Sequence, residues 1–109
     1  MAKLKDPDTT IYMAHYRNEK VGTIRFEAND SVIKTSLMLN PDFLGKGLGL
    51  QVIKMGIEKF IKEEKPSKSL IAEIKKNNVA SIKTFQKVGF KTSGLTFIYD
   101  INAESYNST

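Results

Sequence analysis

The chain has 109 residues, of which 40% are hydrophobic, and this size and composition favour one globular domain with a buried core. Cysteine is absent and histidine occurs once, which excludes disulfide bonds, a cysteine nucleophile and His/Cys metal sites, so we expect no metal ion. The net charge of +5 favours an anionic partner, either a nucleic acid or a phosphorylated small molecule, with charge for solubility alone as an equal alternative.

Membrane and secretion signals are missing from the sequence as given. It has no run of about 18 apolar residues, so we expect no membrane span. The opening segment, MAKLKDPDTT, is basic but lacks the apolar region of a signal peptide. We therefore expect a cytoplasmic protein in which residues 1–109 form one domain, with loose ends at 1–9 and 103–109.

Three strands are predicted in the first part of the chain, at residues 10–16, 21–28 and 31–39. In the second of them, VGTIRFEA, the apolar residues Ile24 and Phe26 alternate with polar ones, which is the period of a half-buried strand. Polar turns, RNEK and ND, separate the three, and Pro41 ends the last. This pattern predicts an antiparallel meander.

Two helices and two more strands are predicted in the rest of the chain. The first helix follows the glycine-rich segment LGKGLG, and its apolar stripe is formed by Leu50, Ile53, Ile57, Phe60 and Ile61. A strand at 69–75, a helix that Asn78 caps and Gly89 ends, and a strand at 92–102 complete the order β-β-β-α-β-α-β. We expect an α+β fold: a mixed, mostly antiparallel sheet with a helix on each side.

The glycine-rich segment is placed where a phosphate group binds well. A helix N-terminus exposes unpaired N–H groups, and glycine lets the backbone approach an anion closely. Gly45, Gly47 and Gly49, with Lys46 among them, therefore predict a pyrophosphate site. The spacing matches neither a Walker A loop nor a Rossmann fingerprint, and a glycine-rich turn without a ligand is the alternative.

Two segments together resemble the GCN5-related N-acetyltransferase (GNAT) superfamily over about residues 21–99. LNPDFLGKGLG is similar to its acyl-CoA motif, with Leu44 where the family prefers Gln or Arg. The second segment matches an N-x-x-S-x-x-x-[FY]-x-K-x-G-F pattern through Asn78, Ser81, Phe85, Lys87, Gly89 and Phe90. The sequence of this segment looks most like that of the branch that acetylates amino groups on nucleotide-linked sugars.

The resemblance implies acetyl-CoA as co-substrate and assigns residues to it. Backbone groups of Leu37, Met38 and Leu39 would pair with its amide arm, Asn78 would hydrogen-bond to that arm, and Phe85 would pack beside the thioester. The pyrophosphate would bind the N–H groups of Gly45, Lys46, Gly47, Leu48, Gly49 and Leu50.

The chemistry expected of such a site is direct transfer of acetyl to a primary amine, because no cysteine is present to form an acetyl-enzyme. Glu73 is the first candidate for the general base, since it interrupts the apolar segment LIAEI and a partly buried carboxylate has a raised pKa. A surface glutamate is an equal alternative, and Glu27 is the second candidate. Phe85 stands where the family often has a proton-donating tyrosine, so coenzyme A leaves as thiolate, or Ser81 or a water donates.

The resemblance implies a small-molecule amine as acceptor, with a nucleotide-linked amino sugar favoured and a protein N-terminus or another small amine as alternatives. Relatives usually carry one or two helices before the meander that help to wall the acceptor site. The chain is therefore the C-terminal domain of a longer enzyme, a short family member, or a subunit completed by a partner, as in a homodimer. The rival functions are a non-catalytic acyl-CoA-binding module and, less favoured, a nucleic-acid binder, because the lysines are scattered over helix faces.

Overall fold

The structure is a computed structural model that describes residues 2–43, 45–93 and 96–99. Leu44, where the acyl-CoA motif departs from the family, and the loose end expected at 103–109 lie outside the described residues.

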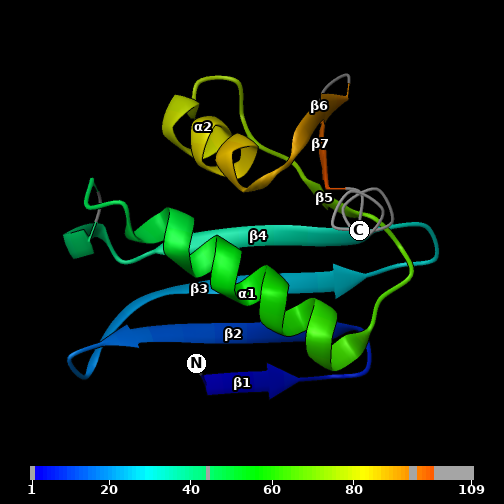
Figure 1. Ribbon diagram of the computed structural model, residues 1–109, viewed down its shortest axis with the longest axis horizontal. Coiled ribbons are helices and arrows are strands. Elements are labelled where there is room, and N and C mark those ends of the chain that lie inside the picture. The colour runs from blue at the N-terminus through cyan, green and yellow to red at the C-terminus, as the bar shows by residue number, and fades with distance from the viewer. Residues whose placement is uncertain (1, 44, 94–95, 100–109) are drawn as a thin grey trace, which may run out of the picture.

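Among the residues described, seven strands form one sheet in the order β1-β2-β3-β4-β5-β7-β6 (Figure 1). Neighbouring strands are antiparallel except β4 and β5, which are parallel. The predicted mixed, mostly antiparallel sheet is therefore confirmed. The strands are β1 (Ala2–Lys5), β2 (Thr9–Tyr16), β3 (Glu19–Ala28), β4 (Ile33–Leu39), β5 (Leu70–Ala72), β6 (Lys91–Ser93) and β7 (Thr96–Tyr99).

Three boundaries differ from the sequence prediction. Residues 2–5, expected in a loose end, form β1, which pairs with β2 across a tight turn closed by hydrogen bonds between Asp6 and Thr9. The strand expected at 69–75 is shortened to β5. In place of the single strand expected at 92–102 there are two antiparallel strands, β6 and β7, and residues 94–95 and 100–102 of that range lie outside the described residues. The loose end expected at residues 1–9 was therefore wrong. The strand was missed because β1 is short and exposed, and such strands carry little apolar pattern.

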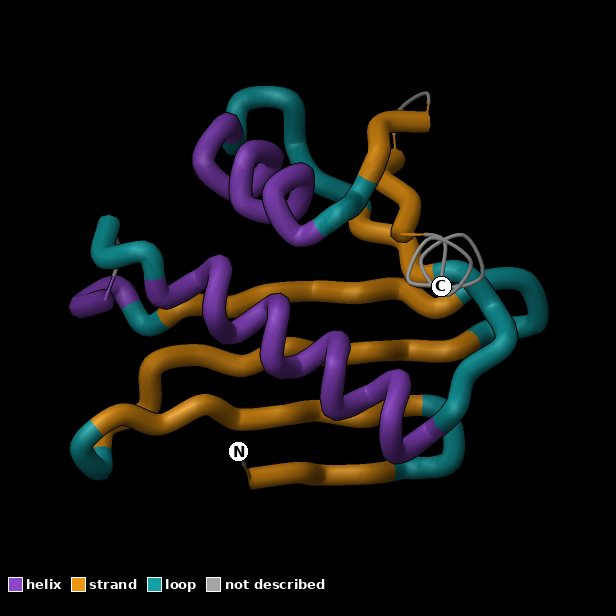
Figure 2. Tube along the Cα trace, in the orientation of Figure 1, coloured by secondary structure: helices purple, strands orange, loops and turns teal. Residues whose placement is uncertain are grey.

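Two α-helices, α1 (Leu48–Glu64) and α2 (Val79–Val88), and one 3₁₀ turn, η1 (Pro41–Phe43), complete the fold (Figure 2). The two helices contact each other, so the expectation of one helix on each side of the sheet is wrong. Crossovers between parallel strands are nearly always right-handed. Since β4, β5 and β6 run the same way and advance in one direction across the sheet, this rule places both connecting helices on one face.

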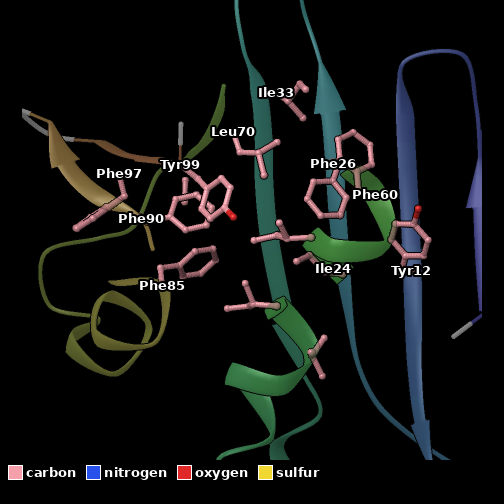
Figure 3. Packing of buried hydrophobic residues seen from close by; sticks show 14 of the residues in the cluster. Tyr12, Ile24, Phe26, Ile33, Phe60, Leu70, Phe85, Phe90, Phe97 and Tyr99 are labelled. Atoms are coloured by element: carbon pink, nitrogen blue, oxygen red, sulfur yellow. The ribbon is translucent and has the colours of Figure 1, made fainter. Parts of the chain in front are cut away.

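The core lies between the sheet and the two helices (Figure 3). Phe26 of β3 stacks on Phe60 of α1 with ring centroids 4.1 Å apart, and Tyr12 of β2 meets Phe26 edge-on at 6.1 Å. The alternation predicted for β3 is confirmed, because Ile24 and Phe26 are buried under α1. Gly56 lets α1 lie close to β3, since a Cβ there would be 2.5 Å from Cγ2 of Ile24.

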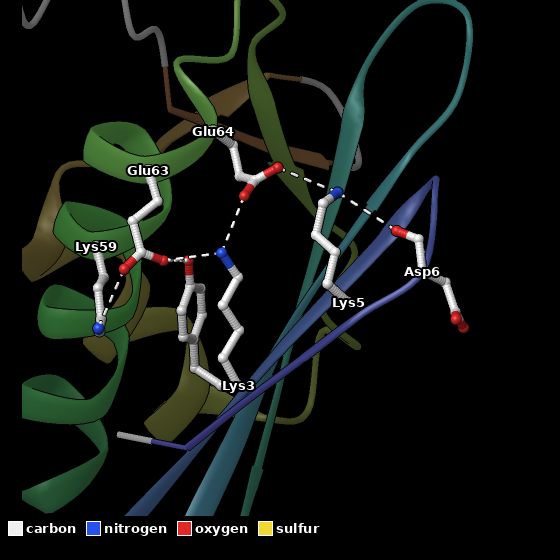
Figure 4. A network of polar contacts seen from close by, with 7 residues as sticks. Lys3, Lys5, Asp6, Lys59, Glu63 and Glu64 are labelled. Atoms are coloured by element: carbon white, nitrogen blue, oxygen red, sulfur yellow. Dashed lines mark hydrogen bonds and ion pairs between the residues drawn. The ribbon is translucent and has the colours of Figure 1, made fainter.

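A polar network fastens β1 and β2 to the last turns of α1 (Figure 4). The Glu63 carboxylate accepts hydrogen bonds from Lys3 Nζ at 2.9 Å, Tyr12 Oη at 2.9 Å and Lys59 Nζ at 3.2 Å. These bonds, the one from Lys3 foremost, lower the pKa of Glu63 from 4.5 to about 2. Burial, and then the bond to Glu63, raise the pKa of Tyr12 to about 12.

We expect this network to make stability depend on pH in the acidic range. The pKa of Glu63 is lower in the folded protein than in the unfolded chain, so its contribution is fully present above about pH 4.5 and is lost as the pH falls toward 2. Thermal unfolding at about pH 6 and about pH 3 should show a smaller acid-induced fall in Tm for Glu63→Gln than for the wild type. Equal falls in Tm for the two proteins would contradict the assignment of this pH dependence to Glu63.

Candidate active site

Strands β4 and β5 separate after a short parallel ladder. Their paired residues are Ile33 with Leu70 and Lys34 with Ile71; β5 then ends at Ala72, whereas β4 continues to Leu39. Beyond these pairs, the β5 side of β4 has no strand partner among the residues described. The backbone there therefore offers N–H and C=O groups to a ligand that lies along it in an extended form.

A cleft of about 480 Å³ occupies the space where the strands separate. Its wall brings residues 34–37 together with residues 73–85, which lie more than 30 positions later in the sequence. The residues that line it are Lys34, Thr35, Ser36 and Leu37 of β4, Glu73, Ile74 and Lys75 after β5, and Asn78, Ser81 and Phe85 at or in α2. Five predicted site residues thus share one cleft: Leu37, Glu73, Asn78, Ser81 and Phe85.

Asn78 reaches the cleft because it is the N-cap of α2. Its side-chain Oδ1 accepts a hydrogen bond from the Ser81 N–H at 3.2 Å, which satisfies one of the unpaired donors of the helix start. This bond does not use the side-chain Nδ2 of Asn78, which can donate two hydrogen bonds. The capping role is therefore compatible with the predicted ligand-binding role of Asn78.

Glu73 lies at the mouth of the cleft, directly after the last residue of β5. Its side chain is 61% exposed, so of the two equal alternatives for this residue the surface glutamate is confirmed and the partly buried carboxylate is wrong. The reason is that β5 ends at Ala72, and the alternation that buries Leu70 and Ala72 turns Glu73 to the other side. Its carboxylate lies 3.5 Å from the ammonium group of Lys34, so an ion pair joins the two walls. Glu27, the second candidate base, pairs with Arg25 instead and does not line the cleft.

Phe85 belongs both to the cleft wall and to the core. It is 3% exposed and meets Phe90 edge-on with ring centroids 5.0 Å apart. Ser81, one turn earlier in α2, is half-buried and carries a hydroxyl group in the same wall.

The three glycines of the segment LGKGLG have two different tasks. Gly45 and Gly47 adopt positive φ angles of 76° and 73°, a conformation that L side chains rarely take, and Gly47 is the N-cap of α1 without a side-chain bond to the helix. Gly49 lies inside the helix, where a Cβ would be 2.9 Å from Cδ1 of Leu39. It therefore serves the packing of α1 on β4, and only the first two shape the loop.

The start of α1 lies beside the open end of β4. The Cβ position of Gly49 is 3.7 Å from Cδ2 of Leu37, a residue of the cleft wall. Lys46 is exposed, with its Nζ 5.6 Å from the centroid of the Phe43 ring, whereas Met38 is 73% exposed. An extended ligand with amides in the cleft and phosphate at the uncapped helix start fits this arrangement.

Comparison with known proteins agrees with this geometry. The model of the acetyltransferase (GNAT) domain family matches residues 2–91. The chain belongs to this family. It is a GNAT-type, acetyl-CoA-dependent N-acetyltransferase domain, as the two sequence motifs predicted. None of the comparisons supports the nucleotide-amino-sugar branch in particular, and no curated protein matches the sequence.

Several solved acetyltransferases share the fold. Aminoglycoside acetyltransferase AAC(6′)-Ib in complex with coenzyme A is 18% identical with a TM-score of 0.77, over 94% of this chain and 72% of that chain. Spermidine N-acetyltransferase SpeG from Vibrio cholerae is 12% identical with a TM-score of 0.80, over 94% and 71%. The ribosomal L7/L12 N-terminal acetyltransferase RimL, with coenzyme A, is 16% identical with a TM-score of 0.77, over 88% and 64%.

Five cleft residues of this GNAT domain were missed in the sequence: Lys34, Thr35, Ser36, Ile74 and Lys75. Of these, Thr35 carried a signal, because in the segment SVIKTSLML it occupies the same alternate positions as Ile33 and Leu37. A polar residue at an inward position of an apolar alternation is a signal that something other than core packing requires it.

In the part of the chain that the structure describes, no helix is long and apolar enough to cross a membrane.

Proposed function

We propose that the domain passes an acetyl group directly from acetyl-CoA to a primary amine, with both substrates bound at once. The observation that carries this proposal is the cleft between β4 and β5, whose wall combines an open backbone edge with the carboxylate of Glu73 and the polar groups of Asn78 and Ser81. Binding and proton transfer are then served at one place.

Acetyl-CoA fits the residues that surround this cleft. We assign its amide arm to the backbone of Leu37, Met38 and Leu39 and to the side chain of Asn78. Its pyrophosphate is assigned to the N–H groups of residues 45–50, where the N-cap of α1 provides no side-chain acceptor of its own. The exposed ammonium of Lys46 adds a positive charge close to these donors.

In the transfer step a general base must take the proton of the amine, whereas a weak general acid is enough for the leaving sulfur. The amine nitrogen attacks the thioester carbonyl carbon, the C–S bond breaks, and the proton of the amine passes to the Glu73 carboxylate. The sulfur leaves as thiolate or takes a proton from the Ser81 hydroxyl, since Phe85 has no proton to give. Exposure of Glu73 lets it return its proton to solvent after each turnover.

The charges around the cleft favour an acceptor that carries negative groups. Two lysines, Lys34 and Lys75, and one acid, Glu73, are the ionised side chains of its lining. Because Lys34 pairs with Glu73, the lining carries one net positive charge, which disfavours polycations such as kanamycin, bound by AAC(6′)-Ib, and spermidine, the substrate of SpeG. An amino sugar on a nucleotide carrier supplies both the amine and phosphate charges, so we place it before a protein N-terminus and before polyamines.

The test combines a binding and a turnover measurement. We expect calorimetry to show acetyl-CoA binding, and thiol release to be fastest with a nucleotide-linked amino sugar in a panel that includes kanamycin, spermidine and a peptide with a free N-terminus. Binding without release for any amine would favour the non-catalytic module, which the phenylalanine at position 85 also permits. Ping-pong initial-rate kinetics would contradict direct transfer.

A further inference from the structure

A hydroxyl group is buried without a partner beside the proposed active site. Thr35 of β4 is 4% exposed, and its Oγ1 has no hydrogen-bond partner within the described ranges 2–43, 45–93 and 96–99. Among those residues it is the one side-chain nitrogen or oxygen atom in this condition. Native proteins rarely leave a buried polar group unpaired, because such a group loses its hydrogen bonds to water and gains none in return.

The surroundings of Thr35 do not explain its hydroxyl. On β3 its pairing neighbour is Phe26, and the residues two positions away on β4, Ile33 and Leu37, are apolar. A valine has nearly the same shape and would fill this position without an unpaired group. What distinguishes Thr35 from other core positions of the sheet is that it lines the cleft, one residue beyond the last pair of the β4–β5 ladder.

We propose that Thr35 is a ligand-binding residue whose hydroxyl hydrogen-bonds to an amide or to the thioester carbonyl of the acyl-CoA arm in the cleft. This inference rests on the proposed function, since it requires the arm to bind there. A threonine hydroxyl both donates and accepts, and a change of its staggered χ1 rotamer moves the oxygen without moving the strand. Because the hydroxyl is already withdrawn from water in the free protein, forming the new bond costs little further desolvation, so the bond favours binding.

The experiment separates the effect on folding from the effect on binding. Thr35→Val should leave Tm of the free protein unchanged or raise it, while raising the calorimetric Kd for acetyl-CoA about tenfold, the loss of one hydrogen bond. Thr35→Ser keeps the hydroxyl and should bind within about twofold of the wild type. Thr10→Val is the matched control, since Thr10 is 2% exposed on β2 and does not line the cleft; its Kd should not change.

Three outcomes would overturn the inference. If Thr35→Val binds acetyl-CoA as tightly as a binding-competent wild type, the hydroxyl is not a ligand group and the proposed function stands. If Thr35→Val lowers Tm, the hydroxyl has a stabilising partner in the free protein. If the wild type itself binds no acetyl-CoA, the proposed function falls together with the inference.

Discussion

Glu73→Gln is expected to lower kcat/KM for the amine by about 10²–10³-fold and to leave the Kd for acetyl-CoA within about twofold of the wild-type value. Glutamine keeps the size of the side chain but cannot accept the proton that the attacking amine must lose. The loss should fall mainly on kcat. In the proposed site, binding of acetyl-CoA depends on the backbone of β4 and on the start of α1, which the substitution does not touch.

The controls for this substitution follow from the positions of other glutamates. Glu19→Gln, at an exposed site at the start of β3, should leave the rate unchanged. Tm of Glu73→Gln should also be close to the wild-type value, because the ion pair with Lys34 is exposed on both sides and such pairs contribute little to stability. A large loss of rate in Glu27→Gln, with Glu73→Gln fully active, would transfer the role of base to Glu27.

Phe26→Ala is expected to lower the free energy of unfolding by about 3–5 kcal/mol, a large part of the stability of a domain of this size. Phe26 is 1% exposed, stacks on Phe60 and meets Tyr12 edge-on, so its removal leaves a cavity between the sheet and α1. The strands and the helix on both sides of this cavity are held by backbone hydrogen bonds and cannot close it fully.

Urea unfolding followed by circular dichroism measures this loss. Tyr16→Ala is the matched control, because Tyr16 is also an aromatic residue of the sheet but is 52% exposed; its cost should stay below about 1 kcal/mol. A cost below about 1 kcal/mol for Phe26→Ala would mean that the helix relaxes onto the sheet and that the core is less closely packed than the ring stacking implies.

The proposed site depends on the place where β4 and β5 stop pairing. β4 is longer than β5, and the gap that results gives an extended ligand the hydrogen-bonding edge that a full-length β5 would occupy. The same gap admits Glu73 from one wall and Asn78 from α2. A longer pairing of β5 with β4 would strengthen the sheet but remove the cleft. The proposed ligand site is therefore obtained at the expense of strand pairing.

Local patterns in the sequence predicted several parts of this structure. The alternation of Ile24 and Phe26 predicted which face of β3 is buried, and the apolar stripe from Ile53 to Phe60 predicted α1 and its orientation. Asn78 as N-cap and Gly89 as stop predicted both ends of α2. These features could be predicted because each depends on residues no more than about one or two turns apart, where side-chain period and capping decide the local conformation.

Other features depended on contacts between distant segments, and only the tertiary structure decided them. β1 is a strand because β2 offers it an edge, and both helices share one face because β4, β5 and β6 advance in one direction. The exposure of Glu73 follows from the early end of β5, and the isolation of the Thr35 hydroxyl follows from its neighbours on other strands. The sequence by itself determined both helices, the strands of the meander, the family and the candidate groups; the first strand, the pairing, the burial and the shape of the cleft were decided by how those elements meet in space.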